Sequence, residues 1–118
     1  MARKLTRKGI VRKLDKLVTD ILLTRDKACV LCGSTTQLGT SHLFSRKAFS
    51  TRWDLQNCNL MCWKHNFAHT YDTYPYTQWF VINYGRGVWE DLHLRFVTPR
   101  KFKTFELIEL YEALKPKP

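Results

Sequence analysis

Two short segments of the sequence carry thiol and imidazole side chains at spacings that suit one metal ion. In the segment CVLCG, Cys29 and Cys32 are separated by two residues, so both thiolates can bind one ion from a tight turn, which the following glycine permits. The segment CWKHNFAH, residues 62–69, offers Cys62 and His65 at the same spacing. Sites of three cysteines and one histidine are a common structural zinc type. The sequence therefore predicts a structural Zn²⁺ bound by Cys29, Cys32, Cys62 and His65.

Cys58 leaves a second ligand set open. With Cys62 it would complete an all-cysteine site, and His65 would then be available for other chemistry. We favour His65 because its spacing from Cys62 repeats that of the first cysteine pair, and a free Cys58 would be an ordinary small buried hydrophobe. A short chain also gains stability from a structural metal, and cysteines in a reducing compartment seldom form disulfides.

A second set of polar residues offers the chemistry that a closed zinc site lacks. Zinc with four protein ligands cannot activate water, so catalysis would need another centre. His42 lies between the two zinc segments, while Asn66 and His69 are three residues apart and would share one face of a helix. A neutral imidazole can take a proton from water while a divalent ion, Mg²⁺ or Mn²⁺, stabilises charge on a phosphate. These residues suit phosphodiester hydrolysis with one divalent ion.

The charge of the chain indicates an anionic partner. The 118 residues include 20 Lys and Arg against 10 Asp and Glu, a formal net charge of +10. Basic side chains displace the counterions of a phosphate backbone, so nucleic acid is the expected partner class. No apolar run could cross a bilayer and no secretory signal is visible, so we expect a cytoplasmic protein without a membrane partner.

The elements that must position these residues fit one α+β domain, residues 1–118. Its first part, 1–26, is expected to be a basic amphipathic helix, with the helical period running from residue 3 to residue 24. The apolar stripe consists of Ile10, Val11, Leu14, Leu17, Val18, Ile21 and Leu22. The opposite face carries Arg3, Lys4, Arg7, Lys8, Arg12, Lys13 and Lys16. That face is either a solvated surface or a contact with a nucleic-acid backbone.

The rest of the chain divides into a metal-binding part, 27–72, and a helical part, 73–115. In the first, the helical period disappears, and loops with a small hairpin are expected before a helix that begins just after Cys62. In the second, Pro75 opens a helix that stops at Gly85, another helix begins near residue 87, and a last amphipathic helix ends at residues 115–116.

The order CxxCG, SHLFSR, TRWDLQN and CxxHN resembles the HNH, or ββα-metal, endonucleases, and specifically the zinc-containing phage recombination nucleases of the lambda NinG (Rap) type. The resemblance covers roughly residues 27–95. It implies a small zinc-stabilised ββα-metal core in which a β-hairpin carries His42 as general base and Asn57 holds the loop that orients the imidazole. A helix would present Asn66, with His69 as a further metal ligand or phosphate contact.

The resemblance also implies substrate contacts and shows two departures. Arg46 is a candidate for binding the scissile phosphate through two parallel hydrogen bonds, and Arg52 is a further candidate for contact with the substrate. Many HNH enzymes have an aspartate directly before the base histidine, where this chain has Ser41, so the catalytic ion would have fewer protein ligands and more water. His65 stands where related enzymes commonly have a fourth cysteine.

These observations predict a metal-dependent DNA endonuclease acting on duplex or branched DNA, as in phage recombination. Symmetric cutting of two strands would call for a homodimer. The main alternative is a non-catalytic zinc-ribbon module that binds nucleic acid, and a second is an adaptor that binds protein through its aromatic helices. Fold-level analogy does not transfer the choice of substrate.

Overall fold

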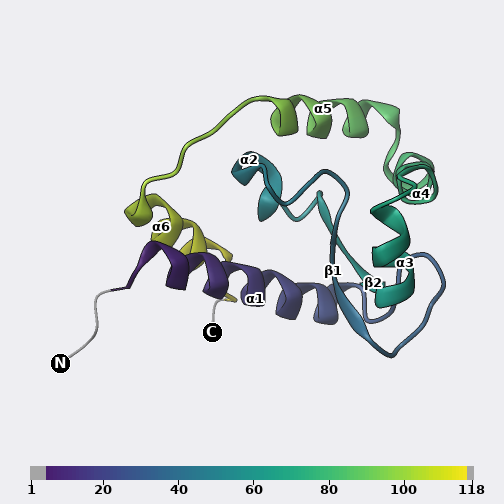
Figure 1. The fold of residues 1–118 in the computed structure, drawn as a ribbon, viewed down its shortest axis with the longest axis horizontal. Helices are drawn as coiled ribbons and strands as arrows, with labels where there is room; N and C mark the ends of the chain where they lie inside the picture. Colours follow the sequence, from purple (N-terminus) through teal and green to yellow (C-terminus); the bar gives the residue numbers. More distant parts are fainter. Residues whose placement is uncertain (1–4, 117–118) are drawn as a thin grey trace.

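The computed structural model describes residues 5–116 and has an α+β fold (Figure 1). Arg3 and Lys4 of the expected basic face lie outside the described residues. In chain order the elements are α1 (Arg7–Arg25), β1 (Leu38–His42), α2 (Phe49–Arg52), β2 (Cys58–Cys62), α3 (Trp63–His69), α4 (Tyr74–Tyr84), α5 (Arg86–Val97) and α6 (Thr104–Leu114). In the described part of the chain, no helix is both long enough and apolar enough to cross a membrane.

The two strands form an antiparallel hairpin on which the rest of the site is assembled. Leu38 pairs with Cys62 at one end and His42 with Cys58 at the other. Helix α3 starts at the residue that follows β2 and packs against both strands. The predicted hairpin and helix are therefore present, with the short helix α2 as an unexpected turn in the connection between the strands.

Strand β2 is buried on both faces and separates two hydrophobic clusters. Because side chains alternate along a strand, Cys58 and Leu60 face one cluster while Met61 faces the other. The first cluster lies against α1 and α6 and includes Leu107, and the second lies against α4 and α5. The hairpin is thus fixed from both sides, which makes it a rigid support for side chains at its edges.

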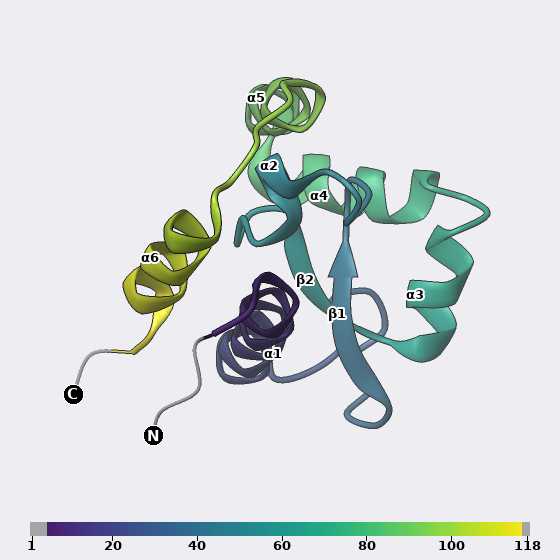
Figure 2. The ribbon, with the colours of Figure 1, turned by 60° about the vertical axis from the view of Figure 1, so that its left-hand side comes forward.

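Helix α1 has the amphipathic character that its sequence predicts. Ile10, Leu14, Val18 and Leu22, each four residues apart, are all buried. Its N-terminus is capped by Thr6, whose Oγ1 accepts a hydrogen bond from the backbone N–H of Gly9 at 3.0 Å. Figure 2 shows α1 between α6 and the hairpin, so one face of α1 borders the strand that carries His42.

The C-terminal helices begin and end close to the predicted residues. Pro75 lies in the first turn of α4, where its missing N–H costs no hydrogen bond. Gly85 ends α4 with φ of 94°, a left-handed conformation that favours glycine, and α5 starts at the next residue. At the start of α6, the Glu106 carboxylate accepts a hydrogen bond from the backbone N–H of Lys103 at 2.9 Å.

Candidate functional site

Four predicted ligands come together at one end of the hairpin. The Sγ atoms of Cys29, Cys32 and Cys62 and a ring nitrogen of His65 all lie within 4.8 Å of one another. Cys62 is the last residue of β2 and His65 lies in the first turn of α3, so the strand-to-helix junction aims both at the loop that carries the other two cysteines. The four residues lie close enough to bind one metal ion.

Backbone hydrogen bonds shape the cysteine loop before any ion binds. The N–H of Gly33 donates to the carbonyl of Cys29 at 2.8 Å, and the N–H of Cys29 donates to the carbonyl of Ser34 at 2.9 Å. Gly33 has φ of 77°, which only glycine adopts at low cost. The N–H of Val30 also donates to the carbonyl of Leu60, which ties the loop to β2. The turn is therefore preorganised by contacts that do not involve the thiols.

The distances between these ligand atoms fit a tetrahedral ion. Zinc bonds of about 2.3 Å to sulfur and about 2.0 Å to nitrogen give edges of about 3.8 Å between two sulfurs and about 3.5 Å between sulfur and nitrogen. Cys32 Sγ and Cys62 Sγ are 3.8 Å apart. His65 Nδ1 lies 3.2 Å from Cys62 Sγ and 3.9 Å from Cys29 Sγ, values that bracket the expected edge.

Cys58 lies outside this cluster. Its side chain is fully buried in the hydrophobic cluster beside α1, and its Sγ donates to the carbonyl of Arg52 at 3.3 Å. Burial raises the pKa of the Cys58 thiol to about 12, so the group stays protonated and uncharged. Of the two ligand sets open at the level of sequence, the geometry brings together the one with His65.

A separate cavity of about 310 Å³ contains several of the predicted catalytic residues. His42, Arg46 and Asn66 line it together with Arg52, and α1 contributes further lining residues that include Asp15. The cavity therefore joins the end of β1, the loop after it, α2, α3 and the side of α1. Four of the residues that the sequence analysis assigns to catalysis or substrate binding are thus brought to one place by different elements.

The hydrogen bond of His42 determines which ring nitrogen is free. Nε2 lies 3.0 Å from the backbone carbonyl of Arg52, and since a carbonyl only accepts, Nε2 must carry the hydrogen. Burial lowers the pKa of His42 below its ordinary value, which favours the neutral imidazole. In that form Nδ1 has a free lone pair, and within the described residues no hydrogen bond occupies it.

Asn57 braces the loop that returns from His42. It is fully buried, and its Oδ1 accepts a hydrogen bond from the N–H of Phe44 at 2.8 Å. Its Nδ2 donates to the carbonyls of Phe44 at 3.1 Å and Thr51 at 3.0 Å. Thr51 immediately precedes the residue whose carbonyl holds His42, so Asn57 positions that carbonyl and does not itself line the cavity. This placement agrees with the loop-holding role implied by the resemblance.

Asn66 and His69 project from the same face of α3 but reach different places. Asn66 Nδ2 lies 3.3 Å from the carbonyl of Thr40, which leaves its Oδ1 as the acceptor atom at the cavity. One turn later, His69 Nε2 lies 3.0 Å from the carbonyl of Leu43, and its ring packs edge-on against Tyr76. His69 does not line the cavity.

The two predicted substrate-binding arginines differ in their surroundings. Arg46 is exposed at the cavity. Arg52 is held inside, with its Nη2 and Nε donating to the Asp15 carboxylate at 2.6 and 3.1 Å, and only 11% of its side chain is exposed. The structure thus places Arg46 where a phosphate could reach it and engages Arg52 in an internal ion pair.

Asp15 is the residue of this site that the sequence analysis missed. Besides Arg52, its carboxylate accepts a hydrogen bond from the indole N–H of Trp53 at 2.8 Å. Burial alone would raise the pKa of Asp15, but the hydrogen bonds from Arg52 and Trp53 outweigh it and the pKa is lowered. The available signal was its position as the one acidic residue in the basic first half of the helix, between Lys13 and Lys16.

Ser41 cannot stand in for the aspartate that precedes the base histidine in many HNH enzymes. It is fully buried and does not line the cavity, because adjacent residues of a strand face opposite sides. Its Oγ has no hydrogen-bond partner among the described residues.

Comparisons of this chain with protein-family models, with curated proteins and with solved structures find no match.

Proposed function

We propose that this protein is a metal-dependent endonuclease of the HNH type that hydrolyses phosphodiester bonds in DNA. The observation that carries the proposal is the cavity in which His42, Arg46 and Asn66 meet, with the Nε2 of His42 fixed by a backbone carbonyl. Such a histidine presents a neutral, oriented Nδ1, which is what a general base requires. The net charge of +10 supports a polyanionic substrate.

In the proposed reaction, His42 Nδ1 accepts a proton from a water molecule as its oxygen attacks phosphorus. The bond between phosphorus and the 3′ oxygen breaks, and that oxygen takes a proton from solvent, leaving a 5′-phosphate and a 3′-hydroxyl. The Arg46 guanidinium is placed to bind the non-bridging phosphate oxygens. The internal pair of Asp15 and Arg52 holds the segment whose carbonyl orients His42.

Two metals enter this proposal. The cluster of Cys29, Cys32, Cys62 and His65 fits Zn²⁺, which with four protein ligands is structural. For the catalytic ion, the donor atoms at the cavity are few: the amide oxygen of Asn66 and a carboxylate, that of Asp15, already engaged by Arg52. In the proposal, Mg²⁺ or Mn²⁺ would therefore keep mostly water ligands there, and the ion would neutralise charge on the phosphate and the leaving oxygen.

A non-catalytic nucleic-acid-binding module with a structural zinc is the second candidate. It is favoured by the fact that, among residues 5–116, the cysteine and histidine cluster is the one group of three or more His, Cys, Asp or Glu side chains close enough to hold a metal. The burial of Ser41 also favours the non-catalytic module, because many HNH enzymes have a metal-binding aspartate at the position that Ser41 occupies here.

The test is incubation of the purified protein with single-stranded, duplex and branched DNA, with Mg²⁺, with Mn²⁺ and with no added divalent ion. We expect divalent-dependent cleavage that leaves 5′-phosphate ends. Binding without cleavage under every condition would favour the module. An absence of binding at low salt would favour an adaptor for another protein. Preference for branched DNA and sedimentation as a dimer would extend the likeness to phage recombination nucleases.

A further inference from the structure

A second cavity, of about 540 Å³, is lined by residues that follow Arg46 and by residues of the C-terminal part of the chain. We call it the basic groove and define it by Arg7, Lys47, Phe49, Phe96, Arg100 and Lys101. These residues come from the start of α1, the loop before α2, α2 itself, the end of α5 and the segment that joins α5 to α6. Figure 1 shows this segment descending past α2 toward α6.

The cations of the basic groove are not neutralised within residues 5–116. Lys47, Arg100 and Lys101 are exposed and form no ion pair with a described carboxylate, and no acidic residue lines the groove. Arg7 donates a hydrogen bond to the carbonyl of Phe102 at 2.6 Å, which fixes its guanidinium without cancelling its charge. Lys47 and Lys101 therefore give the groove a positive charge that no described carboxylate compensates, as a phosphate backbone requires.

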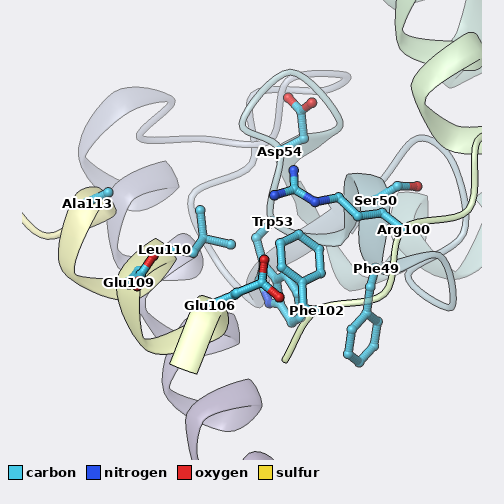
Figure 3. Close-up of a pocket in the computed structure, with 10 residues that line it drawn as sticks. All are labelled: Phe49, Ser50, Trp53, Asp54, Arg100, Phe102, Glu106, Glu109, Leu110 and Ala113. Carbon is cyan, nitrogen blue, oxygen red and sulfur yellow. The ribbon is translucent and has the colours of Figure 1, made fainter. Parts of the chain in front are cut away.

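The opposite side of the same joining segment has a different character. Figure 3 shows that cavity, where the Arg100 guanidinium lies between the carboxylates of Asp54 and Glu106, and Glu109 lies farther along α6. Carboxylates at these positions would repel a phosphate. The distribution of charge thus restricts an anionic chain to the side of Lys47 and Lys101.

Aromatic rings give the basic groove a floor on which nucleotide bases could stack. Phe49 and Phe96 line it directly. The Arg100 guanidinium lies 4.3 Å from the ring centroid of Phe102, and the Arg7 guanidinium lies 5.6 Å from the ring centroid of Phe49, so each cation lies over a ring. Bases stack on aromatic rings and on arginine planes only when unpaired, because a duplex hides the base faces.

We propose that the basic groove binds a single-stranded segment of nucleic acid, with Lys47 and Lys101 contacting phosphates and the phenylalanine floor contacting bases. Lys47 directly follows Arg46, which lines the cavity of His42, so one strand could pass from the groove to the candidate base. The inference rests on the proposed action on nucleic acid and adds its substrate class: DNA with an unpaired strand next to the cut.

The experiment compares two double variants that remove the same charge. Lys47→Gln with Lys101→Gln neutralises the groove, whereas Lys27→Gln with Lys115→Gln neutralises exposed lysines that line neither cavity. Fluorescence anisotropy with a labelled oligothymidylate of about 12 nucleotides reports binding. Salt is varied from about 50 to 200 mM with no divalent ion and no chelator added, so that cleavage is prevented and bound zinc is retained.

We expect the groove variant to bind on the order of tenfold more weakly than wild type, with the slope of log K against log salt reduced by about 1.4, or 0.7 per lost phosphate contact. The control variant should lose far less. Equal affinity and slope in the two variants would overturn the groove. Tighter binding of a duplex of the same length would overturn the single-strand assignment.

The same measurements separate this inference from the proposed nuclease activity. If wild-type protein binds single strands through the groove but cuts no DNA with either ion, the groove stands and the nuclease fails. If wild-type protein cuts DNA and both variants bind alike, the nuclease stands and the groove fails.

Discussion

Removing the imidazole of His65 tests the metal centre against its closest alternative. His65→Ala deletes one ligand of the cluster, whereas Cys58→Ala deletes the thiol that would complete an all-cysteine site. Since Cys58 Sγ already donates to a backbone carbonyl and stays protonated, only the His65 variant should lose the ion. Wild type and Cys58→Ala should each retain one equivalent of zinc.

The two variants should also differ in stability by an amount that follows from linkage. An ion present at 1,000 times its dissociation constant stabilises the fold by about 4 kcal/mol. At about 4 °C per kcal/mol for a domain of this size, loss of the ion should lower Tm by about 16 °C. Cys58→Ala removes one small buried group and should cost about 1 to 2 kcal/mol, or about 4 to 8 °C.

Metal content by mass spectrometry and thermal unfolding by circular dichroism measure both quantities on the same samples. The reasoning is refuted if His65→Ala retains a full equivalent of zinc, or if Cys58→Ala loses it while still folded. Either result would move the ligand set to the four cysteines and free His65 for the active site.

Three further predictions follow from particular contacts. Asp15→Asn should lower the free energy of unfolding by about 1 to 3 kcal/mol because it breaks an ion pair in which Arg52 is buried and Asp15 is half-buried. Asp20→Asn, in an exposed pair, should cost under about 0.5 kcal/mol, and urea denaturation compares the two variants. Burial lowers the pKa of His42 below the ordinary histidine pKa of about 6.5, so the imidazole stays neutral at lower pH than usual. In a profile of cleavage rate against pH, the rate should therefore fall to half its maximum at a pH below about 6.5. A half-maximal rate at a pH above that value would contradict the role of His42 as general base. Leu107→Ala, at a fully buried site beside α1, should cost about 2 to 4 kcal/mol, while Phe105→Ala, at a ring that is 56% exposed, should change unfolding little.

Local signals in the sequence were enough to predict the metal cluster and the helices other than α2. Pro75 and Gly85 bound α4 because each restricts the backbone at its own position, and the two-residue spacings of the ligands specify tight turns without reference to the rest of the fold. The apolar stripe of α1 likewise predicted its buried face, although the helix begins at Arg7 and the expected period begins at residue 3.

Contacts between distant segments could not be predicted in this way. The pairing of Asp15 with Arg52 depends on how α1 crosses the connection between the strands, which no local pattern encodes, so Arg52 was predicted as a substrate contact although its guanidinium is engaged within the fold. Asn66 and His69 do share a helical face, but three residues of helix advance about 4.5 Å and take His69 to the backbone of Leu43. The spacing of Asn66 and His69 predicted that they share a helical face, but it could not predict that Asn66 lines the cavity and His69 does not.

The most direct test of the central claim is the cleavage rate of His42→Ala under single-turnover conditions with Mg²⁺ or Mn²⁺. The variant must first be shown to keep wild-type zinc content and circular dichroism. Loss of a general base should slow cleavage by about 10² to 10⁴-fold while leaving DNA affinity within a few-fold of wild type. A folded, zinc-containing His42→Ala protein that cuts DNA at the wild-type rate would contradict the account.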